Sequence, residues 1–286
     1  MMSTPVSATP LGGLRSASIG VFDSGVGGLS VLREIRRQFP QENLIYLADQ
    51  QHVPYGPRPL AQVRHFSEAI TRFLLNQGAK LIVVACNTAS AAALYKLRET
   101  FPEIPFVGME PAVKPAAEQT QTGVVGVLAT PATFQGRLYA SVIERFANGV
   151  SVLQDTCPGL VAQIEKGELE SAKTRAILER ALTPMLDKGI DRVVMGCTHY
   201  PFVIPLIREI VGPGILVIDP APAVARQVGR VLVDCGLENK TSNAGKVRYL
   251  TSGNVSKLSD LLTLLMGETG NAKPVHWKQN QIIFPV

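Results

Sequence analysis

Four short runs of strand-forming residues occur twice along the chain, in the same order. The runs of the first half begin near positions 19, 44, 81 and 106, and those of the second half begin near 125, 150, 192 and 216. Corresponding positions keep a nearly constant offset, because Gly20 and Gly126 are 106 positions apart and Cys86 and Cys197 are 111 apart. Four matches in register indicate a duplication or a strong architectural constraint.

Segments with helical spacing of apolar residues lie between these runs. They cover 29–39, 63–75 and 174–186, and each ends near a proline or glycine. Strands that alternate with helices predict parallel sheets with right-handed crossovers. The sequence therefore predicts an α/β fold of two parallel-sheet domains, related by a pseudo-two-fold axis, with the active site in the cleft between them. A further strand is expected at 247–250, back in the first domain, and a helix at 257–266.

Prolines divide the predicted domains. Linkers are expected at Pro111–Pro115 and Pro220–Pro222, where prolines interrupt the pattern. The prediction has three parts: a mobile N-terminal tail over 1–18, a first domain over 19–111 plus 220–286, and a second domain over 112–219.

Composition excludes several classes of protein. Of the 286 residues, 46% are hydrophobic and 18% are charged, which provides a core and argues against disorder. The net charge of +5 is scattered along the chain, so direct nucleic-acid binding is not expected, although anionic ligands are favoured. No apolar stretch predicts a membrane span or a signal peptide. We therefore expect a cytoplasmic protein without a membrane partner.

Two of the four cysteines stand in matching positions of the two halves. Cys86 and Cys197 each follow a β-branched run and precede polar residues. In an open parallel sheet, ligands bind beyond the carboxyl ends of the strands. A thiolate is a base, so two thiols facing one cleft predict proton transfer at two faces of a carbon atom.

The spacing of the cysteines argues against other uses of sulfur. No close pair has zinc-ribbon spacing, and a chain of this length needs no disulfide bonds. We therefore expect reduced thiols and no metal. Cys235, at a predicted helix end, is expected to be a packing residue. A helix is expected to begin at Cys157–Leu160 and to lead to Glu165, which by itself appears solvent-facing.

Further polar residues follow the strands. His199 lies two positions after Cys197 and is expected to be its proton partner, with a surface histidine as the alternative. Asp23 precedes a glycine-rich turn over 25–28 that allows a tight backbone turn with its N–H groups aimed at an anion. For Asp23 itself, a helix cap and a role in orienting Cys86 or the ammonium group of its substrate are equal alternatives.

Two segments near the strand ends have simpler interpretations. Thr88 and Ser90 are expected to cap the helix that follows Cys86. Pro54–Gly56 is a turn by composition, with a hydroxyl on Tyr55. From this segment alone, a plain surface loop is the stronger interpretation.

Five of these motifs together resemble those of the glutamate racemases, in the cofactor-independent aspartate/glutamate racemase superfamily. The resemblance extends from Ile19 to about Val231. The motifs are Phe-Asp-Ser-Gly-Val-Gly-Gly-Leu-Ser at 22–30, Pro-Tyr-Gly at 54–56, Val-Val-Ala-Cys-Asn-Thr-Ala-Ser at 83–90, Glu-Pro-Ala-Val-Lys at 110–114 and Gly-Cys-Thr-His-Tyr-Pro at 196–201.

The resemblance implies a role for each site residue. Cys86 would act on the D-isomer of glutamate with support from Asp23, and Cys197 would act on the L-isomer with support from Glu165 and His199. No cofactor is implied. The substrate would contact Asp23, Ser24, Pro54, Tyr55, Gly56, Asn87, Thr88, Thr130, Thr133, Thr198 and His199.

The resemblance also implies a biological setting. The family supplies D-glutamate for peptidoglycan in the bacterial cytoplasm. Some members bind DNA gyrase, and some are activated by a peptidoglycan precursor; the sequence leaves both properties open here, together with homodimer formation.

Three alternatives stay open at this point. A metal-dependent hydrolase would use Cys86, Cys197 and His199 as ligands. A protein that binds an amino acid without catalysis would keep the cleft but exchange no α-proton. An aspartate racemase would use the same chemistry on a shorter substrate.

Overall fold

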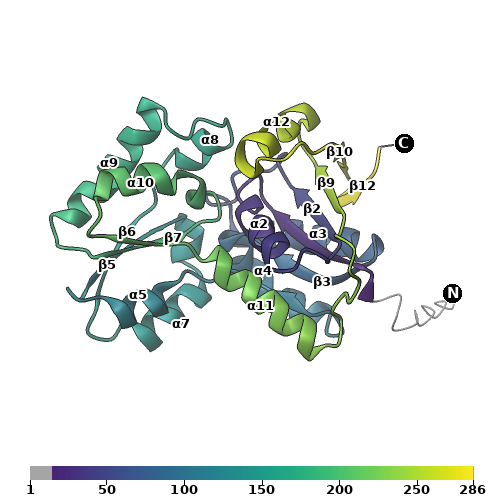
Figure 1. Ribbon diagram of the computed structural model, residues 1–286, viewed down its shortest axis with the longest axis horizontal. Coiled ribbons are helices and arrows are strands. Elements are labelled where there is room, and N and C mark those ends of the chain that lie inside the picture. Colours follow the sequence, from purple (N-terminus) through teal and green to yellow (C-terminus); the bar gives the residue numbers. More distant parts are fainter. Residues whose placement is uncertain (1–14, 286) are drawn as a thin grey trace.

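The computed structural model describes residues 15–285, which form two parallel sheets (Figure 1). The first sheet has the order β10-β9-β2-β1-β3-β4. Its strands are β1 (Ser18–Asp23), β2 (Leu44–Ala48), β3 (Ala79–Val84), β4 (Phe106–Val107), β9 (Val247–Thr251) and β10 (Ala272–Pro274). The second sheet has the order β6-β5-β7-β8. Its strands are β5 (Val124–Ala129), β6 (Ser151–Asp155), β7 (Arg192–Gly196) and β8 (Leu216–Ile218).

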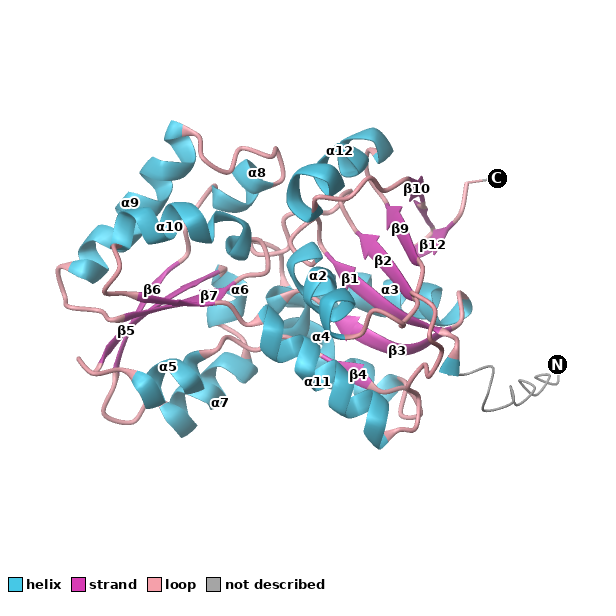
Figure 2. Ribbon diagram, viewed as in Figure 1, coloured by secondary structure: helices cyan, strands magenta, loops and turns pink. Residues whose placement is uncertain are grey.

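Helices cover both faces of each sheet (Figure 2). They are α2 (Leu29–Gln38), α3 (Leu60–Asn76), α4 (Asn87–Thr100), α5 (Val113–Gln119), α6 (Pro131–Phe134), α7 (Arg137–Phe146), α8 (Leu160–Ile164), α9 (Ala172–Leu186), α10 (Ile204–Val211), α11 (Ala221–Asp234) and α12 (Val255–Met266). A 3₁₀ helix spans Tyr200–Val203, and a C-terminal hairpin consists of β11 (His276–Lys278) and β12 (Gln281–Ile283).

Alternate residues of the central strand β1 enter different cores. Ile19 and Val21 pack with α2, α11 and α12, whereas Phe22 packs with α3 and α4. The first of these cores continues into the second sheet through Val193 and Met195 of β7. A strand that is buried on both faces carries a continuous apolar run, and the runs in the sequence therefore predict the strands well. The predicted α/β class with parallel sheets is confirmed.

The proline positions differ from the prediction. Pro115 lies in the first turn of α5, and Pro222 lies in the first turn of α11. Proline is tolerated there because backbone N–H groups in the first turn have no intrahelical acceptor, so the N–H that proline lacks costs no hydrogen bond. These two prolines therefore begin helices and do not lie in linkers.

The last residues of the predicted N-terminal tail, 15–18, contact the first sheet and its surroundings. Ser18 belongs to β1 and pairs with Ala79. Arg15 donates from Nε to the carbonyl oxygen of Gly236 at 3.2 Å. The rest of the predicted tail, 1–14, lies outside the described residues.

Candidate active site

The two matching cysteines share one buried cavity. Cys86 follows β3 of the first sheet and Cys197 follows β7 of the second, and each is 5% exposed. The cavity between them has a volume of about 20 Å³, close to the space that one water molecule needs. Its lining residues are Ser24, Pro54, Tyr55, Gly56, Cys86, Asn87, Thr88, Thr130, Val161, Cys197, Thr198 and His199.

Cys86 is a neutral thiol by its surroundings. It is the N-cap of α4, and its Sγ accepts a hydrogen bond from the N–H of Ala89 at 3.4 Å. Burial and the nearby Asp23 carboxylate raise the pKa of the Cys86 thiol well above its usual range, although the Ala89 N–H opposes this. The cap predicted for Thr88 and Ser90 is thus supplied by the cysteine itself. Ser90 donates to the carbonyl oxygen of Val84 at 3.1 Å instead.

Cys197 lies at one end of a chain of polar side chains. Nδ1 of His199 is 3.8 Å from Sγ of Cys197, and Nε2 of His199 is 2.8 Å from Oε1 of Glu165. Burial alone lowers the pKa of His199, but its hydrogen bonds to Cys197 and Glu165 raise it well above the usual value. Burial raises the pKa of Glu165, but the hydrogen bond and charge of His199, together with hydrogen bonds from Val26 and Gln50, lower it below its usual value. The geometry therefore favours an imidazolium–carboxylate pair beside the Cys197 sulfur.

Close approach between the two sheets requires glycine in the turn after β1. A side chain at Gly25 would overlap Glu165, and one at Gly27 would overlap the ring of His199. The N–H of Val26 donates to Oε1 of Glu165 at 2.7 Å. The turn thus directs an N–H group at an anion, and that anion is Glu165. The glycines are needed for space, since none of those at 25–28 has a positive φ.

Asp23 stabilises the turn and also contacts a residue of the cavity wall. Its Oδ2 accepts hydrogen bonds from the N–H groups of Gly25 and Gly28 at 3.2 and 3.0 Å. The hydroxyl of Thr198 donates to Oδ1 at 3.5 Å. Asp23 is fully buried. Asp23 therefore stabilises the turn and contacts Thr198, but it does not cap α2, whose N-cap is Gly28 with no side-chain cap hydrogen bond.

Asn87 has the least satisfied side chain of the cavity wall. It is 3% exposed, and neither atom of its amide group has a hydrogen-bond partner among residues 15–285. Beside it, the hydroxyls of Thr88 and Thr130 lie 2.8 Å apart, across the two sheets. Thr130 contacts Thr133 at 2.9 Å. A buried amide without a partner is costly, so Asn87 is well placed to bind a ligand.

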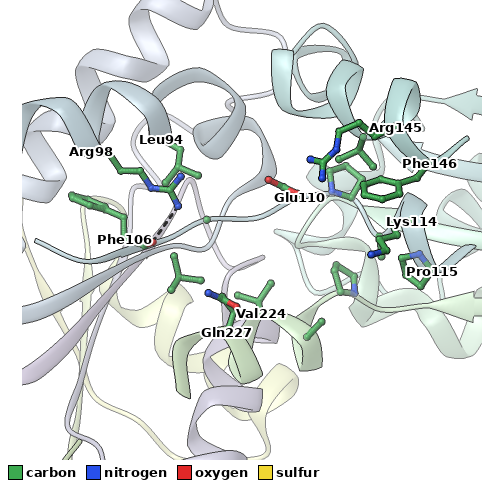
Figure 3. Close-up of a pocket in the computed structure, with 17 residues that line it drawn as sticks. Leu94, Arg98, Phe106, Glu110, Lys114, Pro115, Arg145, Phe146, Val224 and Gln227 are labelled. Carbon is green, nitrogen blue, oxygen red and sulfur yellow. Dashed lines mark hydrogen bonds between the residues drawn. The ribbon is translucent and has the colours of Figure 1, made fainter. Parts of the chain in front are cut away.

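A larger cavity of about 510 Å³ lies away from the cysteines (Figure 3). It is lined by parts of α4, α5, α7 and α11, where the chain passes between the two sheets. Arg98, Lys114 and Arg145 contribute positive charge, and Glu110 contributes one negative charge. Lys114 Nζ and Arg145 Cζ each lie 4.8 Å from the centre of the Phe146 ring. This cavity offers charge complementarity to anions and contains no thiol.

Two further observations concern the described part of the chain. Within residues 15–285, no three His, Cys, Asp or Glu side chains converge closely enough to hold a metal ion. The geometry gives no support to the metal-ligand alternative.

None of the helices in the described part of the chain has the length and apolar character that crossing a bilayer requires.

The sequence pattern of Asp/Glu/Hydantoin racemases matches residues 19–228. The chain belongs to this family. A glutamate racemase from Roseiflexus sp. (strain RS-1) is 53% identical over 245 residues, which cover 85% of this chain and 90% of the relative.

Solved structures of Asp/Glu racemases share the fold. The glutamate racemase isoform RacE1 of Bacillus anthracis has a TM-score of 0.82 at 32% identity, covering 93% of this chain and 99% of that one. The Escherichia coli glutamate racemase, solved with L-glutamate and the activator UDP-MurNAc-ala, has a TM-score of 0.78 at 32% identity, covering 91% and 98%.

The predicted site residues of this Asp/Glu racemase lie in two groups. Most of them line the cavity. Three lie behind it, and each contacts a lining residue: Asp23 contacts Thr198, Glu165 contacts His199, and Thr133 contacts Thr130. Val161 of α8 also lines the cavity, and Gln50 donates to Oε2 of Glu165 at 3.2 Å. The sequence gives no signal for either of these two residues, because an apolar helix residue and a loop glutamine are common everywhere.

Four simple interpretations of single residues are wrong. Glu165 and His199 are buried, at 6% and 2% exposed, and neither is a surface residue. Tyr55 is 1% exposed, so its turn is not a plain surface loop. Cys235 is exposed at the end of α11 and does not pack in a core. Contacts between distant segments decide the burial of the first three.

Proposed function

We propose that this chain is a glutamate racemase that interconverts L- and D-glutamate by a two-base mechanism. The observation that carries the proposal is the shared cavity between Cys86 and Cys197, which come from the carboxyl ends of two different sheets. The activity of the Roseiflexus and E. coli relatives supports glutamate as the substrate. Racemisation needs one base on each face of the α-carbon, and two thiols from opposite walls meet that need.

The surroundings of the two thiols suggest which proton moves first. A neutral Cys86 thiol is ready to deliver a proton, because burial and Asp23 keep it protonated. Cys197, beside the His199–Glu165 pair, would remove the α-proton of L-glutamate. The proton of Cys86 then reaches the opposite face of the carbanion and gives D-glutamate. In the reverse direction Cys86 must first lose its proton.

Polar groups of the wall would stabilise the carbanion. No electron-withdrawing cofactor is proposed, so hydrogen-bond donors must hold the charge that moves onto the substrate carboxylate. The unpartnered amide of Asn87 and the hydroxyls of Thr88 and Thr198 are the nearest candidates. Loss of one such donor costs roughly 10²–10³ in rate in other enzymes.

Substrate entry would require the cleft to open. A cavity of about 20 Å³ admits about one water molecule, far less than an amino acid. We propose that two units separate for entry, and that these are the predicted domains over 19–111 plus 220–286 and over 112–219. Closure around the substrate would then exclude water from the carbanion.

Proton exchange in D₂O tests the proposed function. NMR of L- and D-glutamate with the protein should show loss of the α-proton signal from both isomers, and aspartate should exchange far more slowly. Tight binding of glutamate without exchange would favour an amino-acid-binding protein. Faster exchange of aspartate would favour an aspartate racemase.

We also propose that the cavity of Figure 3 binds an anionic effector. The activator of the E. coli relative is a uridine diphosphate derivative. Arg98, Lys114 and Arg145 supply the positive charge that a diphosphate would need. Binding of UDP, measured by calorimetry, should weaken in Arg98→Ala and Arg145→Ala but not in Arg175→Ala, whose side chain pairs with Glu209 elsewhere. Equal binding in all variants would contradict this site.

The proposed product sets the biological role. D-Glutamate would serve peptidoglycan synthesis in a bacterial cytoplasm. Homodimer formation and an interaction with DNA gyrase are further hypotheses by family analogy.

A further inference from the structure

A single buried carboxylate connects Tyr55 to the C-terminal part of the chain. Asp49 follows β2 and is fully buried. Its Oδ2 accepts a hydrogen bond from the Tyr55 hydroxyl at 2.6 Å. Its Oδ1 accepts hydrogen bonds from Nε1 of Trp277 and from the hydroxyl of Ser252, both at 2.7 Å. Both oxygens of Asp49 are therefore occupied by groups from three separate segments.

The segments that meet at Asp49 are distant in sequence. Ser252 follows β9, and Trp277 belongs to β11 of the C-terminal hairpin, beyond the family match that ends at residue 228. The hairpin strand β12 packs on α3, next to the edge of the first sheet (Figure 1). Among the described residues, this hairpin thus reaches the active-site wall through Asp49.

Aromatic rings also pack around the hydrogen bond between Asp49 and Tyr55. His52 stacks on Phe66 with ring centres 4.0 Å apart, and Nδ1 of His52 lies 2.9 Å from Oδ2 of Asp49. The Trp277 ring lies 5.5 Å from Phe66, and the Tyr55 ring lies 5.7 Å from it. Short hydrogen bonds and ring packing together leave Tyr55 one orientation.

We propose that Asp49 is a positioning residue for the glutamate site, and that Trp277 holds Asp49 so that Tyr55 keeps its place in the cavity wall. This inference rests on the proposed function. The hydroxyl proton of Tyr55 is committed to Asp49, so the Tyr55 oxygen faces other partners only as an acceptor. Tyr55 can then contribute to substrate binding in two ways, through the rigid shape of its ring and as an acceptor of a hydrogen bond. Disorder at Asp49 should therefore raise KM more than it lowers kcat.

Trp277→Phe is the sharpest single test. Phenylalanine keeps a ring beside Phe66 but removes the N–H that donates to Asp49. The KM for L-glutamate should rise by roughly 5- to 10-fold, in line with the net loss of one typical hydrogen bond, with kcat within about twofold. Ile282→Val is the matched control, because it trims the core of the same hairpin and keeps the Nε1–H of Trp277 that donates to Asp49; its KM should be unchanged.

A double-mutant cycle tests whether Asp49 acts through Tyr55. If it does, Asp49→Asn combined with Tyr55→Phe should raise KM no more than the worse single variant. Additive effects, or an unchanged KM in Trp277→Phe, would overturn the inference. If Asp49→Asn fails to fold, Ser252→Ala replaces it, since it removes a different donor to the same carboxylate.

A measurement without turnover separates this inference from the proposed function. Exchange of glutamate by the wild-type protein in D₂O tests the function alone. Tyrosine labelled with ¹³C at Cζ reports the Tyr55 phenol directly, and the Tyr55→Phe variant assigns its resonance. The resonance should shift in Trp277→Phe and stay in Ile282→Val. An unmoved resonance in Trp277→Phe would count against the positioning role even in an active racemase.

Discussion

Oε1 of Glu165 lies 2.8 Å from Nε2 of His199 and also accepts the N–H of Val26 at 2.7 Å. Glu165 and His199 belong to the part of the chain that carries the second sheet, whereas Val26 follows β1 of the first. One carboxylate therefore joins His199, the proposed proton partner of Cys197, to the turn that follows β1 of the first sheet. Under the proposed opening and closing of the cleft, this contact would couple closure to the charge of His199.

Both cysteines of the cavity are expected to be essential. Cys86→Ser and Cys197→Ser should each reduce racemisation by about 10³-fold or more, because a hydroxyl is a much weaker acid than a thiol. Cys157→Ala is the buried control and Cys235→Ser the exposed one; both should keep near wild-type rates. The assay is the change in optical rotation of glutamate, and a surviving rate in either active-site variant argues against the two-base mechanism.

Glu165→Gln should change the pH profile. Without the carboxylate, the pKa of His199 should fall, because a hydrogen bond to a neutral amide raises it less than the hydrogen bond to the Glu165 carboxylate does. The rate with L-glutamate should drop by roughly 10²-fold, and its dependence on pH should move to lower pH. The profile of kcat/KM from pH 5 to 10, roughly the accessible range around these groups, checks this. An unshifted profile would show that Glu165 has no effect on proton transfer through His199 and Cys197.

The same variant should lose stability in a defined pH range. Glu165 has a lowered pKa, so its contribution is present above about 4.5 and is lost as the pH falls through its folded value. His199 has a raised pKa, so its contribution is complete below about 6.5 and is lost as the pH rises through its folded value. The free energy of unfolding should therefore differ most from wild type between these two values, by about 1–3 kcal/mol. Urea unfolding across this range measures the difference.

Asn87→Ala should separate stability from activity. The buried amide has no partner, and its removal should leave the melting temperature unchanged or higher, since an unsatisfied group costs about 1–3 kcal/mol. The rate should fall by about 10²–10³-fold. Thr71→Val is a matched control, because Thr71 of α3 also has an unpartnered buried hydroxyl but lies outside the cavity. That variant should gain stability at an unchanged rate; a large loss of stability in Asn87→Ala would argue for a structural role.

Gly27→Ala should impede closure of the cleft. The added methyl group would overlap the His199 ring, and the two walls would then meet at a greater distance. A misplacement of this kind costs about 10²-fold in rate. Gly214→Ala is the control, because nothing lies within 4 Å of the position of its added carbon. Rates of proton exchange and thermal melting of both variants distinguish a closure defect from unfolding.

The sequence by itself determined the fold class and the position of the two thiols. Strands such as Leu44–Ala48 and Arg192–Gly196 are buried on both faces, so each appears as a local apolar run. The point at which such a run ends marks the carboxyl end of a strand, where ligands bind. Cys86 and Cys197 were predictable for this reason, since their placement depends on short segments only.

Only the tertiary structure decided the burial and the contacts of the residues around them. Glu165 appeared solvent-facing and Tyr55 appeared to lie on a surface loop, yet both are buried. The contact partners of Glu165 include Val26, 139 positions away, and those of Asp49 include Trp277, 228 positions away. Burial and pKa depend on which distant groups meet after folding, and no local pattern of residues encodes those meetings.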